Sequence, residues 1–330
     1  MSPSTFFRLF THLQMMPILE SGEETLVGGQ AVMEGVMMRA PHSYCVSVRK
    51  ASGEIVKEEM PLARMSEQYK IFRYPVFRGI GTLYQALKLG GRALRFSANA
   101  ALDDPSLQKP GKAAPPKEMP AWAMAAPILF SLLFFIFMYK VVPLFVVTRL
   151  ATVWPVLNGN WPSALVDGGI RFAILLGLLY TLSQTKDIRR VFQYHGAEHK
   201  VVFNFESGQE VNVQNAQRFS TFHPRCGTSF LFVVFLISIP IYAVLPWHGF
   251  AAKLIARVLL MLPIAGLSYE LIRFAAKRPG SFMAILTAPG LWTQRITTKA
   301  PTDEQAEVAI HALDGAMALE KSQGGELVIA

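Results

Sequence analysis

The chain has 330 residues, a formal net charge of +9, 52% hydrophobic residues and only 17% charged residues. This composition excludes intrinsic disorder, which combines low hydrophobicity with high charge, and it is too apolar for two ordinary soluble domains. Two cysteines cannot form a disulfide framework, so Cys45 and Cys226 are expected to be free thiols in a reducing compartment or metal ligands. We therefore expect a membrane protein.

The amino-terminal third is expected to lie outside the bilayer. Residues 1–24 form a variable N-terminus that lacks the apolar run and cleavage site of a signal peptide. Residues 25–62 are predicted to form β structure, because Gly28 and Gly29 open an apolar stretch, residues 44–49 alternate, and a turn at 51–53 precedes a hairpin partner at Ile55 and Val56. The remainder of the 25–102 region mixes basic with aromatic and aliphatic residues, which predicts amphipathic helix, either on the cytoplasmic membrane surface or packed on the β unit. Residues 103–120, rich in Pro, Lys and Ala, are a linker.

Four apolar windows approach the length of about 20 residues that a helix needs to cross a bilayer. They cover residues 122–147, 164–183, 228–247 and 252–274 of a membrane domain at 121–300. The fourth window is the weakest, because charged residues flank a short apolar centre. The fold class is therefore an α-helical polytopic membrane protein with about four transmembrane helices and a small β-rich unit.

The basic residues predict the topology. Residues 1–120 hold 15 of the 32 Lys and Arg, whereas the link at 148–163 holds only Arg149. The positive-inside rule then places both termini and the histidine-rich loop at 184–227 in the cytoplasm. Because the basic excess lies where topology alone would put it, we expect membrane lipid and no nucleic acid as a partner. In the 301–330 tail, Thr302 and Gln305 have the spacing of a capping box, which predicts a helix.

The loop between the second and third windows carries the pattern His-x-x-Glu-His at residues 195–199. His195 and His199 are four residues apart and share a face if the segment is helical, so their imidazoles can bind one metal ion, with Glu198 as general base. His223 and Cys226 follow before the third window and offer one more imidazole and one thiolate. This donor set predicts a divalent metal, zinc, and hydrolysis as the chemistry that zinc supports.

Other interpretations stay open. The histidines could be structural, with backbone carbonyls as partners, and a closed set of three histidines and one cysteine would leave no position for water. A transporter would require Asp167 and Glu270 to face a common cavity, although Arg273 lies one turn after Glu270 and can pair with it. The sequence contains no P-loop, no dinucleotide-binding glycine motif and no Gly-x-Ser-x-Gly elbow.

Several motifs together resemble one known family. They are the glycine-flanked stretch at residues 28–39, His-Gly-Ala-Glu-His-Lys at 195–200, His-Pro-Arg-Cys-Gly-Thr-Ser-Phe at 223–230, and Pro-Gly-Leu-Trp at 289–292 with Thr-Thr at 297–298. The chain is similar over nearly all of residues 25–315 to the YqhQ-like bacterial membrane family, a domain of unknown function (DUF1385). Its members are described as predicted metal-dependent enzymes, so the resemblance implies the bacterial inner membrane and a metal, but no substrate.

These observations favour a membrane-embedded metal-dependent hydrolase at the cytoplasmic interface, with a lipid-linked molecule or a peptide segment as substrate. The alternative is a non-enzymatic membrane assembly factor or transporter component with a structural histidine and cysteine site. The sequence does not indicate an oligomeric state.

Overall fold

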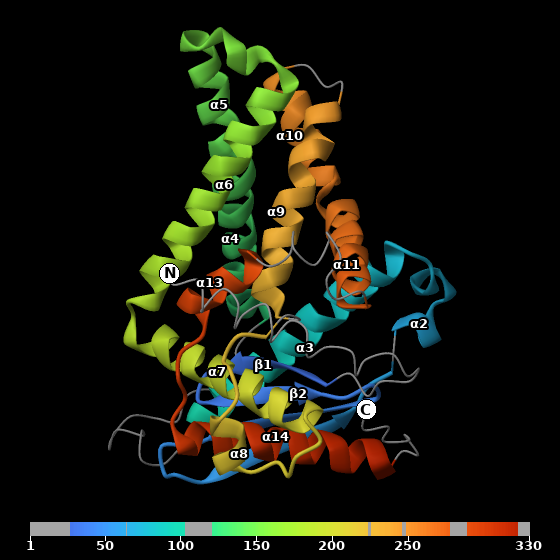
Figure 1. The fold of residues 1–330 in the computed structure, drawn as a ribbon, viewed down its shortest axis with the longest axis vertical. Coiled ribbons are helices and arrows are strands. Elements are labelled where there is room, and N and C mark those ends of the chain that lie inside the picture. The colour runs from blue at the N-terminus through green and yellow to red at the C-terminus, as the bar shows by residue number, and fades with distance from the viewer. Residues whose placement is uncertain are drawn as a thin grey trace.

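The computed structural model describes residues 27–63, 65–102, 121–223, 226–245, 249–277 and 289–322. The chain is mostly helical and has two parts (Figure 1): a bundle of long helices, and a sheet unit at one end of it. The predicted variable N-terminus and the predicted 103–120 linker lie outside the described residues.

The sheet is a four-stranded antiparallel meander in the order β1-β2-β3-β4. Its strands are β1 (Gly28–Val32), β2 (Gly35–Arg39), β3 (Ser43–Arg49) and β4 (Ile55–Pro61). Val32 pairs with Gly35 across a two-residue turn in which Glu34 has a φ of 53°. Gly53 turns the chain between β3 and β4 with a φ of 90°, which glycine adopts without strain. The predicted β structure is confirmed.

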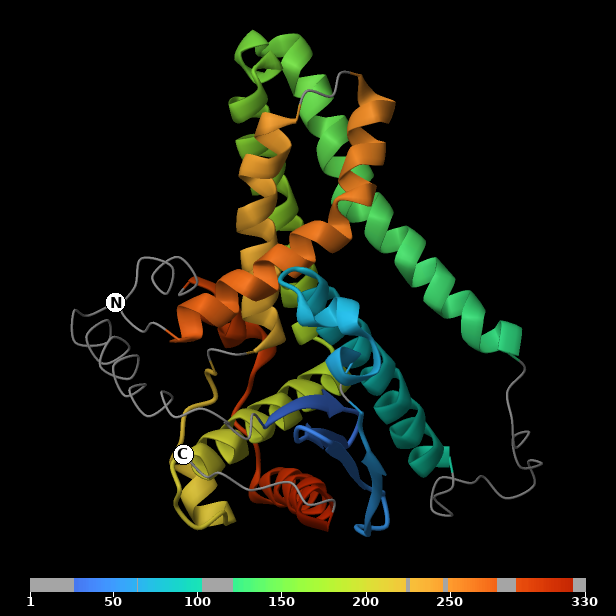
Figure 2. The same cartoon turned by 90° about the vertical axis from the view of Figure 1, so that its right-hand side faces the viewer.

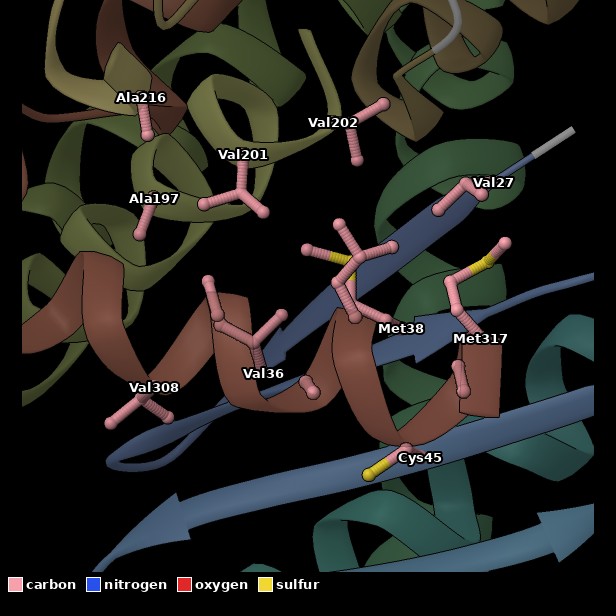
Figure 3. Packing of buried hydrophobic residues seen from close by; sticks show 14 of the residues in the cluster. Val27, Val36, Met38, Cys45, Ala197, Val201, Val202, Ala216, Val308 and Met317 are labelled. Carbon is pink, nitrogen blue, oxygen red and sulfur yellow. The ribbon is translucent and has the colours of Figure 1, made fainter. Parts of the chain in front are cut away.

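Helices cover both faces of this sheet, as Figure 2 shows from the side. On one face lie α7 (Lys186–Glu206) and α14 (Asp303–Ser322), and on the other lies α3 (Phe77–Leu102). Successive strand residues point to opposite faces. Figure 3 shows Val36 and Met38 in the core formed with α7 and α14, whereas Met37 belongs to the core beneath α3. The sheet unit is therefore assembled from segments that are far apart in the sequence.

The two helices predicted outside the bilayer are both present. In α3, Leu89 and Ala93 are buried against the sheet, so this helix packs on the β unit, the second of the two alternatives. At the start of α14, the backbone N–H of Thr302 donates to Gln305 Oε1 at 3.0 Å, and the N–H of Gln305 donates to Thr302 Oγ1 at 3.4 Å. The capping box is confirmed.

Within the described parts of the chain, three helical segments are long and apolar enough to cross a membrane: Leu129–Val153, Asn160–Ser183 and Gly227–Val244. A fourth is obtained if Phe250–Leu259 and Met261–Ala275, which meet at 48°, form one broken span. Pro263 lies just after this break and cannot donate the backbone hydrogen bond that would continue the helix. The four predicted windows thus correspond to helical segments, the fourth of them bent.

Each bundle segment has the following bounds. The first comprises α4 (Ala121–Ile136), a π-helical turn η4 (Phe137–Val141) and α5 (Val142–Val153); then come η5 (Pro155–Asn158), α6 (Asn160–Ser183), α9 (Gly227–Val244), α10 (Phe250–Leu259), α11 (Met261–Lys277) and α13 (Pro289–Thr297). The short elements of the sheet unit are α2 (Met65–Gln68), η2 (Lys70–Arg73) and α8 (Val213–Gln217).

Candidate metal centre

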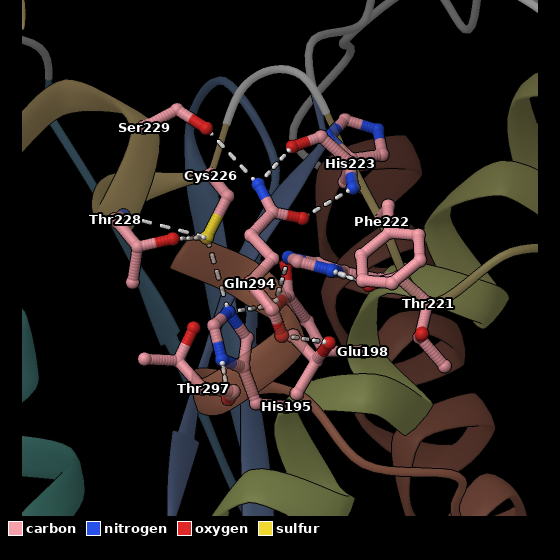
Figure 4. Close-up of polar contacts among 12 residues, drawn as sticks. His195, Glu198, Thr221, Phe222, His223, Cys226, Thr228, Ser229, Gln294 and Thr297 are labelled. Carbon is pink, nitrogen blue, oxygen red and sulfur yellow. Dashed lines mark hydrogen bonds and ion pairs between the residues drawn. The ribbon is translucent and has the colours of Figure 1, made fainter. Parts of the chain in front are cut away.

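Helix α7, which lies between the sheet and the bundle, carries the His-x-x-Glu-His pattern. The helical spacing brings His195 and His199 together, and their ring centroids are 4.4 Å apart. Both rings and Glu198 line a cavity of about 100 Å³, whose other wall is formed by the glycines that begin β1 and by the residues before α9. The predicted pair therefore shares one face of α7 and lines one cavity. Figure 4 shows His195 and Glu198 at this site, together with Cys226.

Each histidine is held through its Nδ1 atom by a backbone carbonyl. His195 Nδ1 lies 2.8 Å from the oxygen of Thr297, and His199 Nδ1 lies 2.5 Å from the oxygen of Thr221. Because a carbonyl oxygen only accepts hydrogen bonds, both Nδ1 atoms must carry the proton. In the neutral rings, both Nε2 atoms then present a lone pair to the cavity, which is the arrangement of metal-binding histidines.

The sulfur atom of Cys226 lies next to the two imidazoles. It caps the amino terminus of α9, and its Sγ lies 3.2 Å from His195 Nε2 and 3.3 Å from Thr228 Oγ1. The ligand atoms of His195, His199 and Cys226 all lie within 4.8 Å of one another. Three of the four predicted metal ligands therefore converge.

Glu198 lies beside this group. Its Oε2 is 3.9 Å from His195 Nε2 and 3.7 Å from His199 Nε2, and the residue is 7% exposed. The backbone of β1 passes close to it, since a Cβ atom on Gly29 would lie against Glu198 Cγ. The carboxylate is thus within reach of the space between the two imidazoles, as its predicted role as a base requires.

His223, the fourth predicted ligand, lies behind His199 and outside the group of three. Its ring centroid is 5.5 Å from that of His199 and 4.5 Å from that of Phe203, and its Nε2 lies 3.5 Å from Glu206 Oε2. Burial lowers the pKa of His223 to about 4, so the ring is neutral at physiological pH. It also lines the cavity, and its role as a ligand stays a prediction.

Two further residues shape the site without having been singled out from the sequence. Gly196 allows the backbone at Lys299 to cross α7, because a Cβ at this position would collide with the Lys299 carbonyl oxygen. Gln294 on α13 is fully buried; its Oε1 accepts the backbone N–H of His223 at 2.8 Å and its Nε2 donates to the His223 carbonyl at 2.7 Å. Glycine inside a helix signals such a close approach, whereas a single buried glutamine carries no comparable signal.

The weaker candidates do not join the site. Cys45 is fully buried, and burial raises the pKa of its thiol to about 12, so it is unreactive. The two cysteines are free, as predicted. Asp167 pairs with Arg171 and Arg257 inside the bundle.

Glu270 lies in a different network. It pairs with Arg78 of α3 and accepts the backbone N–H of Val76 at 3.2 Å. The sequence suggested Arg273 as the partner of Glu270, but the partner in the structure is Arg78, which lies on another helix. Asp167 and Glu270 have separate sets of partners, so the common cavity that a transporter would need is not formed by this pair in the described structure.

Comparison with known proteins identifies the family of the chain. A family model described as a protein of unknown function, DUF1385, matches residues 74–319. The uncharacterized protein YqhQ of Bacillus subtilis (strain 168) is 34% identical over 300 residues, which cover 89% of this chain and 92% of the relative. No solved structure matches the chain. The chain therefore belongs to the DUF1385 family.

Proposed function

We propose that the protein is a membrane-embedded, metal-dependent hydrolase whose site lies at the cytoplasmic face of the bacterial inner membrane. One observation carries this proposal: the ligand atoms of His195, His199 and Cys226 converge within 4.8 Å while the opposite nitrogen of each ring is held by a backbone carbonyl. Histidines with a purely structural role would not need their ligand atoms gathered around one thiol.

The donor set suits zinc. Two imidazoles and one thiolate are ligands that zinc prefers, and three protein ligands leave a fourth position open, as in catalytic sites. Ligand atoms in a tetrahedral zinc site are about 3.3–3.8 Å apart, close to the 3.2 Å between His195 Nε2 and Cys226 Sγ. A zinc ion held there would supply Lewis acidity and lower the pKa of a water bound to it to about 7.

Residues of the chain itself would transfer the proton of the attacking water and orient the two histidine rings. Glu198, within 3.9 Å of both Nε2 atoms, accepts the proton of the attacking water and can return it to the leaving group. The carbonyls of Thr297 and Thr221 hold the two rings in one tautomer, which keeps their lone pairs aimed at the cavity. The nucleophile is thus water, and the bond that breaks belongs to an ester, amide or phosphoester in the substrate.

The size of the cavity limits the substrate. A cavity of about 100 Å³ is smaller than the roughly 300–1,000 Å³ pockets that enclose a whole small molecule. We therefore propose a substrate that inserts only one group, such as a lipid-linked molecule or a peptide segment at the membrane surface. The basic residues of the 1–120 region and of the 184–227 loop support a cytoplasmic position for this face.

Metal analysis of the detergent-purified protein tests the proposal. We expect about one zinc per chain in the wild type and a loss of metal in His199→Ala, because this change removes one of three ligands. His311→Ala is the matched control, since His311 is an exposed histidine on α14 and outside the cluster. Wild type with no more zinc, manganese or iron than His199→Ala would refute metal binding.

A structural metal site in a non-enzymatic assembly factor is the second candidate. The ligands come from α7 and from the start of α9, so a metal would tie the sheet unit to the bundle. Glu198→Gln separates the two functions. A hydrolase variant of this kind keeps its metal but fails to complement a deletion strain, whereas a structural site predicts full complementation.

A further inference from the structure

A second cluster of charged residues lies inside the helical bundle, away from the metal centre. Asp167 and Arg171 on α6, Arg257 on α10 and Lys140 on η4 are 0%, 6%, 5% and 9% exposed, respectively. Charged residues buried among apolar helices are costly and commonly mark a binding site or an ion pathway. This cluster holds three cations and one carboxylate.

The contacts show that this carboxylate does not balance the cations. Asp167 lies 2.6 Å from Arg257 Nη1 and 2.9 Å from Arg171 Nη2, so its single negative charge is shared between two guanidinium groups. Arg171 Nη1 also donates to Ser238 Oγ at 2.7 Å, but its Nε is buried without a hydrogen-bond acceptor among the described residues. A buried donor left without an acceptor costs about 1–3 kcal/mol.

The third cation is held only by neutral partners among the described residues. Lys140 Nζ donates to the hydroxyl of Tyr242 at 3.1 Å and lies 5.6 Å from the centre of the same ring. The guanidinium carbons of Arg171 and Arg257 lie 5.0 and 5.1 Å from that ring centre. Three cations around one tyrosine ring leave an excess of positive charge in an apolar setting, which favours binding of an anion.

A small cavity next to the cluster has the chemistry to receive that anion. It measures about 30 Å³ and is lined by Arg257, Lys253, Tyr242, Asn160 and Ser163, together with apolar residues and with no carboxylate among the described lining residues. Asn160 and Ser163 are in the first turn of α6, so the cavity lies near the end of the bundle that is opposite the sheet unit, where α6 begins (Figure 1). It offers two cations and neutral hydrogen-bond donors.

We propose that this cavity binds the phosphate group of an anionic phospholipid. Guanidinium groups match the paired oxygens of phosphate, and about 30 Å³ is room for roughly two water-sized oxygens rather than for a whole small molecule. The outer face of α10 and the end of α9 expose Ile255, Leu259 and Val244, which would lie along the acyl chains. The lipid as source of the phosphate depends on the membrane location proposed above, whereas phosphate binding itself does not.

The test uses the full-length protein, delipidated in a neutral detergent, with thermal unfolding and native mass spectrometry as readouts. Phosphatidylglycerol is expected to raise the unfolding midpoint and to appear as a bound lipid, and phosphatidylcholine to bind at least tenfold more weakly. Inorganic phosphate in place of lipid, with sodium chloride at equal ionic strength, shows whether the free anion suffices. A response to phosphate alone supports the same phosphate site with a soluble ligand.

Two variants locate the binding. Arg257→Gln removes a lining cation but also one partner of Asp167, so it can fail to fold. Lys253→Gln removes the other lining cation, which has no ion pair among the described residues, and is expected to weaken binding at least tenfold while the protein stays folded. Arg149→Gln, a cation of the same bundle outside the cavity, is the control and should bind as wild type does.

No response of the wild type to either phosphate source would overturn the proposal. An equal response of wild type and Lys253→Gln would overturn it as well. Neither result depends on zinc content, so failure here is distinguishable from failure of the proposed hydrolase.

Discussion

Replacing Gly196 by alanine is the sharpest perturbation of the metal centre, because two effects of known size oppose each other. Alanine is the better helix former by about 1 kcal/mol, so propensity alone predicts that the variant is more stable. The added Cβ, however, would collide with the carbonyl oxygen of Lys299 and lie 3.2 Å from its carbonyl carbon. The segment at 297–299 must then move away from α7.

The cost of that movement can be worked out from the contacts it breaks. Lys299 N–H donates to the Phe192 carbonyl at 2.9 Å, and His195 Nδ1 lies 2.8 Å from the Thr297 carbonyl. Two lost hydrogen bonds cost about 1 kcal/mol each, and overpacking adds about 1–3 kcal/mol. After subtraction of the gain in propensity, the net destabilisation is about 2–4 kcal/mol. His195 also loses its tether, so zinc affinity should fall about 10–100-fold.

Thermal unfolding and zinc titration of the purified variant measure both effects. Gly91→Ala is the matched control, because Gly91 is exposed in the interior of α3 and a Cβ there meets nothing within 4 Å. That substitution should leave zinc binding unchanged and stabilise the protein by up to about 1 kcal/mol. If Gly196→Ala were as stable as wild type and bound zinc equally well, the close crossing at Lys299 could not be what orients His195.

Three other consequences can be measured. Burial tends to raise the pKa of Glu320, but hydrogen bonds from His42 and from Ser43 outweigh it and lower the pKa below its ordinary value of 4.5. The carboxylate therefore stabilises the fold above about pH 4.5 and loses this contribution as pH falls through the lowered pKa. The difference in unfolding midpoint between wild type and Glu320→Gln should shrink over that range. Iodoacetamide should label Cys226 and leave Cys45 unmodified, and saturating zinc should protect Cys226; mass spectrometry of tryptic peptides reads both. Thr302→Ala should cost about 1 kcal/mol through loss of the cap on α14, seen as a lower unfolding midpoint.

Local patterns in the sequence predicted the elements whose geometry is set by near neighbours. The i, i+4 spacing of His195 and His199 fixes their common face because α7 is a regular helix through both. The capping pair at Thr302 and Gln305 acts within one turn. The strands at 25–62 were predicted from apolar stretches that end at glycine turns. Alternation is incomplete in β2 and β3, because helices cover both faces of the sheet and each face needs apolar residues.

Features that depend on contacts between distant segments could not be predicted in this way. His223 and Cys226 are three residues apart and were equal candidates, yet only the sulfur reaches the other donors. The difference between the two residues lies with Gln294, which is 71 residues further along the chain than His223. Its side chain forms hydrogen bonds with both the backbone N–H and the carbonyl of His223. The carbonyl groups that hold the two histidines could not be predicted either. Every residue has a carbonyl, and only the folded structure determines which one lies next to a histidine.

The carbonyl tethers also explain why the proposed metal centre would depend on the folded chain rather than on helix α7 alone. The pattern at 195–199 supplies two imidazoles, but in an isolated helix either nitrogen of each ring could carry the proton and both side chains could change rotamer. The carbonyls of Thr297 and Thr221 remove that freedom, one for each ring. Metal bound only to this arrangement stabilises the folded state by mass action, by about 2.7 kcal/mol when the free metal is one hundred times the dissociation constant. That stabilisation acts on the junction of the sheet unit with the bundle, because α7 belongs to the one and the chain leading into α9 belongs to the other.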